Sequence, residues 1–285
     1  MRKDPIPGWV TAVVFGGAFL GIALLERRRP LRGRREPPLR RLGRNLTLGG
    51  ISAAATTALQ GRLLEPLARR IERRRLGLLP RLPLPPALRT ILGVLLLDYT
   101  LWWWHRLNHQ NPLFWRFHVI HHIDLDLDAS TAVRFHFGEM MLSVFFRSAQ
   151  FRLIGPDALA STLWQLMLLV SIVFHHSNLR LPERAERVLS RLLVTPRLHG
   201  IHHSTVRDQT SSNWSSLLSL WDLLHGTFRD DVPQDRIRIG VPAWQDPREV
   251  TLGEMLVEPL RPHPRDAWLP LPPTSSSGPP EGSQG

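Results

Sequence analysis

Cysteine is absent from this chain of 285 residues. Its absence excludes disulfide bonds and every metal site that is built from thiolates. Tyrosine occurs once against ten tryptophans, and nearly all of the 36 basic residues are arginine, which gives a net charge of +12. A charge of this sign fits an anionic partner, either nucleic acid or anionic lipid headgroups. The positions of the arginines along the chain distinguish the two.

Two short sequence signals are missing as well. No small-residue cleavage site follows the first apolar segment, 8–25, so a signal anchor or first transmembrane helix is favoured over a cleaved signal peptide. No dinucleotide-binding or flavin-binding motif is present. A redox enzyme with this sequence would therefore receive its electrons from a separate protein.

Long apolar segments occupy much of the chain before residue 176. The clearest are 8–25, 87–109, 138–155 and 158–175, and a weaker one is 46–64. Eighteen uncharged residues are near the lower limit for a helix that spans a bilayer. The basic segment 68–75, ARRIERRR, predicts an amphipathic interfacial helix instead. We expect an all-α integral membrane bundle of about four or five membrane helices, with a cytosolic helical cap after residue 176.

Arginine is concentrated beside these segments. Residues 26–44 contain nine arginines, and short loops this basic tend to remain in the cytoplasm. Such a loop either meets the anionic inner leaflet or is simply solvated. Because the arginines flank apolar segments, nucleic-acid binding is disfavoured. The composition, rich in Arg, Leu and Pro, favours a bacterial inner membrane.

Histidine is the residue type that forms motifs. WHRLNH contains a His-x3-His pair, and FHVIHH and LHGIHH each contain His-x-x-His-His. The motif histidines are His105, His109, His118, His121, His122, His199, His202 and His203. Neutral imidazole binds iron, zinc, copper and nickel. Eight imidazoles are too many for one ion of four to six ligands, and they suit two ions. The isolated His263 is interpreted as an ordinary surface or packing residue.

The first histidine pair shares a helical face with a carboxylate. His105 and His109 are four residues apart, so both imidazoles can bind one metal ion from a rigid helix. Asp98 lies on the same face, and an ionisable residue inside a membrane helix is costly and indicates function. Asp98 either accepts a hydrogen bond from a ligand imidazole or makes a polar contact between helices. We expect all three motifs at one membrane face, the cytosolic one.

These motifs together resemble the fatty acid hydroxylase / sterol desaturase superfamily, which comprises integral membrane non-haem di-iron oxidases. The matching linking phrases are DLDLDASTAVRFHFGE (124–139), HHSNLRLP (175–182), TPRLHGIHHS (195–204) and SNWSSLLSLWDLLHGTF (212–228). The resemblance covers about 87–230. The expected division of the chain is N-terminal membrane helices and Arg-rich loops (1–86), a catalytic domain (87–230), a C-terminal extension (231–262) and a disordered Pro/Gly/Ser-rich tail (263–285).

The resemblance implies a set of metal ligands. The eight motif histidines match ligands of the family. His176, in the family's His-Ser-Asn phrase, matches a further ligand, whereas His175 matches a variable position. The phrase Arg-x-His-x-x-Glu matches Arg134, His136 and Glu139. The resemblance makes His136 either a ligand or the neighbour of one.

Other polar positions carry weaker expectations. Asn213 is a candidate for a role in catalysis, and His225 stands where the family has an aromatic residue, so it is expected to pack. Three aspartates follow the second motif, namely Asp124, Asp126 and Asp128. A calcium loop is excluded because its glycine and glutamate positions are Ala129 and Phe135. We expect these aspartates to cap a helix or to lie at the substrate mouth.

The activity that the resemblance implies is O2-dependent hydroxylation or desaturation of a lipid C–H bond at two irons. The substrate would be a fatty acyl, sterol-like, isoprenoid or ether lipid taken from the membrane. Electrons would come from a ferredoxin-type or cytochrome-type partner, ultimately from NAD(P)H, and a basic cytosolic face suits an acidic partner. Hydroxylation, desaturation and ether cleavage share this kind of site, so the sequence does not distinguish them. Nor does it indicate the oligomeric state.

Two other classes of protein would use the same histidines. A non-redox membrane metal-binding or transport protein would need a polar path across the bilayer. Few ionisable residues lie in the apolar segments besides Asp98, Glu139, Arg147 and Arg152. A zinc hydrolase would need a general-base carboxylate beside the metal, and the glutamate position of an HExxH motif is Arg106 here. Both classes are therefore disfavoured.

Overall fold

The computed structural model describes residues 5–269, and every regular element in that range is helical. The α-helices are α1 (Gly8–Arg28), α2 (Pro38–Arg74), α3 (Pro86–Gln110), α4 (Pro112–His122), α5 (Phe137–Ile154), α6 (Ala158–His176), α7 (Glu183–Leu189), α8 (Pro196–His202), α9 (Arg207–Thr210), α10 (Leu220–His225) and α11 (Leu252–Val257). The 3₁₀ turns are η1 (Leu79–Arg81), η2 (Ala129–Val133), η3 (Gln234–Arg236) and η4 (Glu258–Leu260). The expected all-α class is confirmed.

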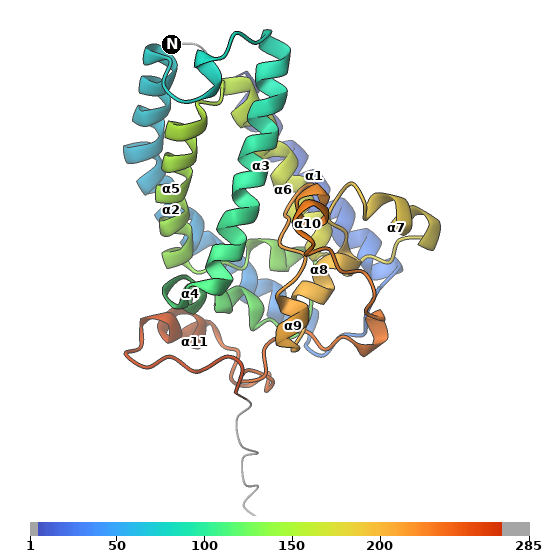
Figure 1. Ribbon diagram of the computed structural model, residues 1–285. Coiled ribbons are helices and arrows are strands. Elements are labelled where there is room, and N and C mark those ends of the chain that lie inside the picture. The colour runs from blue at the N-terminus through green and yellow to red at the C-terminus, as the bar shows by residue number, and fades with distance from the viewer. Residues whose placement is uncertain (1–4, 270–285) are drawn as a thin grey trace, which may run out of the picture.

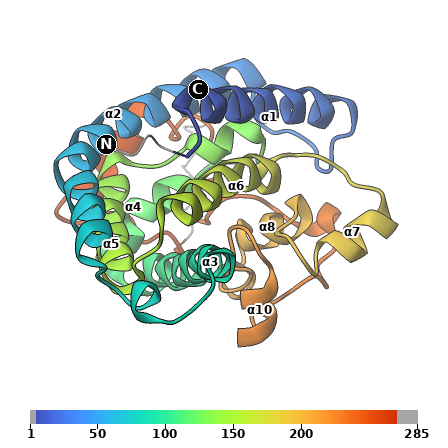
Figure 2. The same cartoon turned by 90° about the horizontal axis from the view of Figure 1, so that it is seen from above.

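The long helices form a bundle, and short helices collect at one end of it (Figure 1). α2 packs along α5, and α6 packs against both α1 and α3. Seen from above, α6 lies between α1 and α3 (Figure 2). The helix α5 lies beside α2 at the left of Figure 2. α4, α8, α9 and α11 lie at the lower end of the bundle in Figure 1. The C-terminal ends of α3 and α6 therefore reach the same layer as α4 and α8.

Three predicted membrane helices occur almost as expected. α3, α5 and α6 match 87–109, 138–155 and 158–175 to within one residue at each end. The region before them differs, because α2 is one continuous helix of 37 residues. It joins the weak apolar segment 46–64 to the predicted interfacial helix 68–75, and Pro66 inside it does not end it. Arginine is a good helix former, so the basic charge that suggested a separate helix does not interrupt the backbone pattern.

Fewer helices than expected are apolar enough to cross a membrane by themselves. Among the described residues α1 and α6 qualify by length and composition, and α2 through η1 with α3 qualifies as a pair bent by 88°. α5 carries three charged residues within its eighteen positions, namely Glu139, Arg147 and Arg152. The expected four or five membrane helices thus reduce to two or three candidates.

A close approach of two helices sets the frame of the site. A Cβ added at Gly93 of α3 would lie 2.8 Å from the Cβ of Ala160 in α6. Small residues at such a contact allow helix backbones to approach closely. The contact holds together the two bundle helices whose far ends carry His105 and His176.

An apolar cluster lies beneath the bundle and includes the C-terminal segment. Leu48 of α2 and Ile120 of α4 pack there with Trp244 and Met255. Ala267 belongs to the same cluster, and the Trp268 ring stacks on Trp115 with 5.7 Å between the ring centroids. Packing therefore continues as far as Trp268, within the tail that was expected to begin at 263. The rest of that tail, 270–285, lies outside the described residues.

Candidate metal centre

Nine histidines meet at the lower end of the bundle in two groups. Within each group the nearest ring nitrogens all lie within 4.8 Å of one another. We call the first group site A, which consists of His105, His109, His118, His122 and His202. We call the second group site B, which consists of His121, His176, His199 and His203. The structure thus brings together all eight motif histidines and His176.

The repeated His-x-x-His-His spacing has a geometric reason. On a helix the first histidine of the motif lies on the same face as both others, but the second and third are adjacent residues about 100° apart around the helix axis, so they can point to different sites. In α4, His118 and His122 face site A, while His121 faces site B. In LHGIHH the assignment is reversed, since the first and last histidines face site B and His202 faces site A. Each motif therefore supplies two ligands to one site and one to the other.

Local signals fix where the short ligand helices begin. The Asn111 side chain caps α4 by accepting a hydrogen bond from the Leu113 backbone at 2.9 Å, and Pro112 is the first helical residue. The Thr195 hydroxyl caps α8 in the same way, and Pro196 follows it. Proline is preorganised for the first position of a helix. These starts set the phase of both helices and hence the direction of each imidazole.

Backbone carbonyls hold four of the imidazoles from behind. The Nδ1–H groups of these rings donate to Trp214 (from His105, 2.7 Å), Arg134 (from His121, 3.1 Å), Ile172 (from His176, 2.7 Å) and Ser212 (from His202, 2.9 Å). A carbonyl oxygen can only accept, so Nδ1 must carry the proton and Nε2 must present a lone pair. This is the usual arrangement behind a metal-bound histidine.

The ring nitrogens within site B lie close enough together to share a metal ion. His176 Nε2 lies 2.9 Å from His121 Nε2 and 3.0 Å from His199 Nε2. Because His121 and His176 both hold their protons on Nδ1, two lone pairs point at each other across 2.9 Å. In site A, the Nε2 atoms of His118 and His202 are buried without any partner. The donors present therefore fit a metal ion in each site.

Burial keeps these imidazoles neutral. It lowers the pKa of His202 to about 3, and it lowers the pKa of His122 and His203 well below the ordinary value, reinforced by neighbouring histidines. Neutral imidazole is the form that binds metal. At neutral pH no proton has to leave before an ion can bind.

The same pKa shifts predict how the metal-free protein responds to acid. A histidine whose pKa is lower in the folded state stabilises the fold fully above its unfolded pKa of about 6.5. That stability is lost as the pH falls from there toward the folded value, about 3 for His202, at roughly 1.4 kcal/mol per pH unit for each such residue. The unfolding temperature of chelator-treated protein should fall steeply between pH 6.5 and 5. An unchanged unfolding temperature over this range would contradict the neutral assignment.

Glu139 is a supporting residue whose role the sequence did not indicate. It lies in the first turn of α5, is buried, and its Oε1 accepts a hydrogen bond from His118 Nδ1 at 2.8 Å. A carboxylate behind a ligand histidine orients the ring and raises its basicity. The Arg-x-His-x-x-Glu phrase contains this glutamate, but the neighbouring sequence does not indicate which histidine the carboxylate contacts.

Removing the charge of Glu139 should weaken metal binding without removing a ligand. We expect Glu139→Gln to reduce metal affinity in site A by roughly 10-fold to 100-fold. Competition with a graded chelator, read by metal analysis, would measure the change. Glu183→Gln, an exposed carboxylate on α7, serves as the control. Equal affinity in Glu139→Gln and the control would show that the contact does not support the ligand.

His136 lies outside both sites, which corrects its candidacy as a ligand. Its Nδ1 accepts a hydrogen bond from the Gly138 backbone at 3.0 Å, and its Nε2 lies 3.2 Å from the Leu256 carbonyl. Both ring nitrogens are therefore used, one to cap α5 and one to hold the C-terminal segment. His175 also lies outside the two sites, as expected, although its ring packs on His199 with 4.1 Å between centroids.

Asp98 makes the polar contact between elements rather than the contact with a ligand. Its Oδ2 accepts hydrogen bonds from the Trp221 indole at 2.6 Å and from the Leu218 backbone at 3.2 Å. It thereby fastens α3 to the segment around α10. His225 packs in the same region, stacked on Trp102 with 4.2 Å between ring centroids, as expected.

Asn213 shapes the loop behind site A instead of pointing at the metal ligands. Its φ is 53°, a left-handed conformation that asparagine tolerates better than most residues. Its side chain donates to the carbonyls of Leu198 and Arg229 and accepts from the Arg229 backbone. The carbonyls on either side of it, Ser212 and Trp214, are the ones that hold His202 and His105. Asn213 is therefore a positioning residue.

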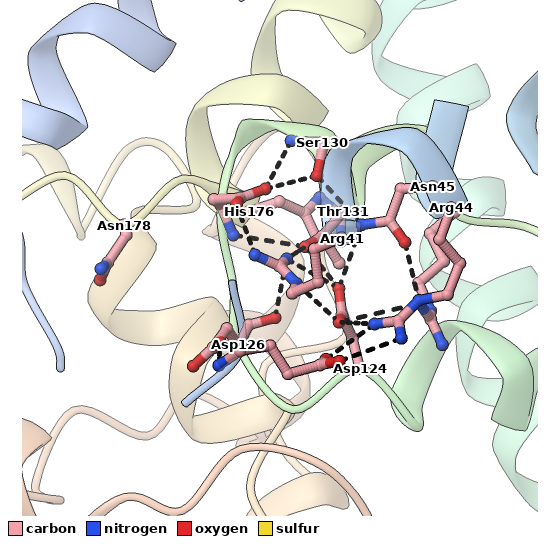
Figure 3. Close-up of polar contacts among 12 residues, drawn as sticks. Arg41, Arg44, Asn45, Asp124, Asp126, Ser130, Thr131, His176 and Asn178 are labelled. Carbon is pink, nitrogen blue, oxygen red and sulfur yellow. Dashed lines mark hydrogen bonds and ion pairs between the residues drawn. The ribbon is translucent and has the colours of Figure 1, made fainter. Parts of the chain in front are cut away.

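The three aspartates after the second motif form the centre of a buried ion network (Figure 3). Arg41 of α2 binds both carboxylate oxygens of Asp124 at 2.9 Å and also pairs with Asp128. Asp128 caps η2, in agreement with the expectation that these aspartates cap a helix. Asp126 accepts the backbone N–H groups of Arg35 and Glu36. The network joins α2 and the basic loop to the segment that follows α4.

Positive charge dominates the surroundings of Asp124. Arg41, with help from Arg134 and Arg44, outweighs the effect of burial and holds the pKa of the Asp124 carboxyl well below its usual range. Arg134 also donates to the Ile120 carbonyl at 2.9 Å, and its own carbonyl holds His121. The network thus reaches from the basic loop to a ligand of site B.

One surface opening reaches the metal centre. A cavity of about 330 Å³ has His109 of site A in its wall. The other lining residues are Arg106, Gln110, Trp115, Arg207, Thr210, Ser211, Trp214, Thr227 and Trp268. Trp115 and Trp214 pack against the His109 imidazole, with 4.8 and 4.6 Å between the ring centroids. Fold and site together define a helical protein with membrane-spanning candidates and two histidine-lined metal sites.

The comparisons with known proteins agree with this class. Residues 90–227 match the fatty acid hydroxylase family. Ornithine lipid hydroxylase OlsE of Rhizobium tropici is 30% identical over 158 residues, 55% of this chain and 46% of that protein. Alkylglycerol monooxygenase of Homo sapiens is 31% identical over 137 residues, 48% and 29% of the two chains. Very-long-chain aldehyde decarbonylase GL1-8 of Oryza sativa subsp. japonica is 28% identical over 159 residues, which is 54% of this chain and 59% of that protein.

The resemblance to the fatty acid hydroxylase family that the motifs predicted is confirmed over residues 90–227. It spans less than half of the length of the first two relatives and 59% of the third. No solved structure matches the chain.

Proposed function

We propose that the protein is a membrane-bound di-iron oxygenase that uses O2 to hydroxylate or desaturate a lipid. The observation that carries this proposal is the donor set of sites A and B, which consists of imidazoles only. Imidazole suits iron, and a site without thiolate or carboxylate ligands differs from the structural zinc and calcium sites of proteins. The named activities of the relatives, lipid hydroxylation and alkylglycerol monooxygenation, support the same reaction class.

In this proposal the histidines would bind the iron, and other residues of the chain would orient the histidines. Site A and site B would each hold one iron, and bound iron would supply the activation of O2 needed to attack an unactivated C–H bond. Glu139 and the carbonyls of Ser212 and Trp214 keep protons on the Nδ1 atoms behind site A. Trp115 and Trp214 would orient the His109 imidazole by packing against it. Ligand geometry is thus fixed before substrate arrives.

A lipid substrate follows from the position of the ligands. His105 and His176 lie at the ends of α3 and α6, whose preceding turns are apolar and exposed to the membrane in part. An acyl chain can therefore approach from the bilayer, while the headgroup stays at the interface beside the basic loop. We infer a bacterial inner membrane with sites A and B on the cytoplasmic side, in agreement with the positive-inside rule.

Electrons would come from an acidic ferredoxin-type or cytochrome-type partner, ultimately from NAD(P)H. Arg106 and Arg207, beside the cavity at His109, offer positive charge for such docking. Turnover with the partner should fall as ionic strength rises, because salt screens exposed charges. A turnover rate unchanged by salt would count against this docking surface.

A zinc hydrolase is the leading alternative from another class. It needs a free carboxylate as general base beside the metal. The carboxylate of Glu139 contacts a histidine of site A, but it lies behind His118 and accepts a hydrogen bond from its Nδ1. A transport protein is disfavoured for a different reason. Arg147, midway along α5, lies 4.9 Å over the ring of Trp164 and has no ion-pair partner among the described residues, so it forms no chain of polar groups.

Metal content and O2 uptake of the detergent-purified protein test the proposal. We expect about two irons per chain after anaerobic reconstitution, and reductant-dependent O2 uptake that total membrane lipid stimulates. Mass spectrometry of that lipid would then identify the product as hydroxylated or desaturated. Stoichiometric zinc that iron cannot replace, without O2 uptake under any reductant, would overturn the oxygenase and favour the hydrolase or a metal-binding protein.

A further inference from the structure

A second cavity, of about 750 Å³, lies behind site B, away from the opening at His109. Its walls come from the basic loop after α1, the segment after α4, the turn between α6 and α7, and residues 233–239. Five arginines line it, namely Arg32, Arg35, Arg180, Arg197 and Arg238. Three carboxylates line it as well, namely Asp126, Glu183 and Asp235. The lining therefore carries an excess of positive charge.

The chain does not neutralise this charge itself. Within residues 5–269 none of the five arginines forms an ion pair, although arginines elsewhere do, such as Arg229 with Asp208 and Arg261 with Glu254. The carboxylate of Asp126 is already engaged by the backbone N–H groups of Arg35 and Glu36. Glu183 and Asp235 are exposed on the surface side. The five guanidinium groups therefore have no ion-pair partner within the described residues, although Arg35 donates to Gln245 and Arg180 to the Leu31 carbonyl.

Arg32 is the most deeply placed of the five. Its Nη1 donates to the Gln234 side chain at 2.6 Å and to the Pro196 carbonyl at 3.2 Å. Its Nε and Nη2 atoms are buried and have no hydrogen-bond partner. A buried cation with unpaired donors costs free energy unless an anion compensates it. The unpaired donors of Arg32 therefore indicate that this cavity binds an anionic group.

We propose that this cavity binds the phosphate group of an anionic ligand through its arginine lining. Guanidinium groups bind phosphate with two parallel hydrogen bonds, and several of them around one cavity favour an anion with several oxygens. The volume is larger than a single phosphate ion needs, so a headgroup fits. The wall begins at Leu31, three residues after α1 ends at Arg28, which puts the cavity at the membrane surface where anionic headgroups lie.

The ligand would sit against a helix that carries metal ligands. A Cβ added at Gly200 of α8 would overlap the guanidinium of Arg32, so the two are in direct contact. Gly200 lies between His199 of site B and His202 of site A. A bound phosphate would compensate Arg32 and thereby hold α8 in place. This proposal does not depend on the proposed oxygenase activity, because binding can be measured without turnover.

Isothermal titration calorimetry on the full-length protein in a neutral detergent tests the proposal. The probes are dihexanoylphosphatidylglycerol, dihexanoylphosphatidylcholine and inorganic phosphate. We expect saturable binding of the anionic lipid, and affinity about tenfold lower for the zwitterionic lipid. The double variant R197Q/R238Q should weaken binding roughly tenfold for each guanidinium lost. Both side chains line the cavity, and among the described residues neither forms a hydrogen bond with a histidine of site A or site B.

The control is R184Q/R187Q, which removes two exposed arginines from α7 that do not line the cavity. It should bind like the unaltered protein. Inorganic phosphate binding as tightly as the lipid would identify a soluble phosphate compound as the source, whereas a clear preference for the lipid would identify a headgroup. Equal weakening in both double variants would reveal general surface charge and overturn the proposal. Absence of saturable binding by any probe would overturn it too.

Discussion

Replacing His203 with alanine should lower the iron content from two ions per chain to one or fewer. His203 Nε2 lies 3.1 Å from His199 Nε2 in site B, and its ring stacks on His122 of site A with 4.2 Å between centroids. The substitution removes one of four donors from site B and leaves a void beside site A. We expect O2 uptake to fall by more than the roughly 100-fold loss typical of supporting residues. Metal analysis and oxygen-electrode assays would measure both.

His263→Ala is the matched control, because His263 is exposed and belongs to neither site. It should retain two irons and full O2 uptake. His203→Ala with unchanged iron content would mean that site B is not a metal site. Retained iron without O2 uptake would instead separate metal binding from the reaction, and it would argue against two equivalent ligand groups.

Replacing Arg41 with methionine should cost about 3–5 kcal/mol of folding free energy. Arg41 and Asp124 are both almost fully buried, and the substitution leaves Asp124 and Asp128 without their main counter-charge. Denaturant titration in detergent micelles, followed by circular dichroism, would measure the loss. The unaltered Asp124 has a depressed pKa, so its stabilising effect is present above the unfolded value of about 3.9 and is lost only at lower pH. The loss caused by Arg41→Met should therefore be similar at pH 8 and pH 6.

The same helix offers the matched control. Arg69→Met removes an exposed arginine of α2 that pairs with Glu65 one turn earlier at 3.5 Å. Exposed pairs at this spacing contribute roughly 0.3–0.5 kcal/mol. A comparable loss in the two variants would mean that burial does not make the Arg41 network special. A small loss in both would show that the aspartates find other counter-charges, such as Arg44 and Arg134.

The histidines that meet in sites A and B could be identified from sequence because their geometry is local. His118 and His122 share a helix face through spacing alone, and the same holds for His199 and His203. Long apolar runs likewise fixed α3, α5 and α6 almost to the residue, since nothing else in those segments competes with a helix. The fold class and the resemblance to the family could therefore be predicted.

Partners that are distant in sequence could not be predicted. Asp98 meets Trp221, which is 123 positions away, and Arg41 meets Asp124, which is 83 positions away. Each of these side chains could form a hydrogen bond or an ion pair with several other residues, and the packing of the helices determines which of them is close enough. For this reason the sequence left open whether Asp98 supports a ligand or joins two elements, and it did not identify the partner of Glu139. In α2, the run of arginines at 68–75 was taken as a separate helix, but arginine does not interrupt a helical backbone.

The crossed use of the two His-x-x-His-His motifs has a consequence for how the protein acquires its ions. α4 and the LHGIHH segment each contribute to both sites, so filling one site orders ring nitrogens that belong to the other. The second ion then meets donors whose conformational entropy has already been lost. Uptake should therefore be cooperative, and at limiting iron the population should divide between empty and doubly filled molecules. Singly loaded chains should be scarce.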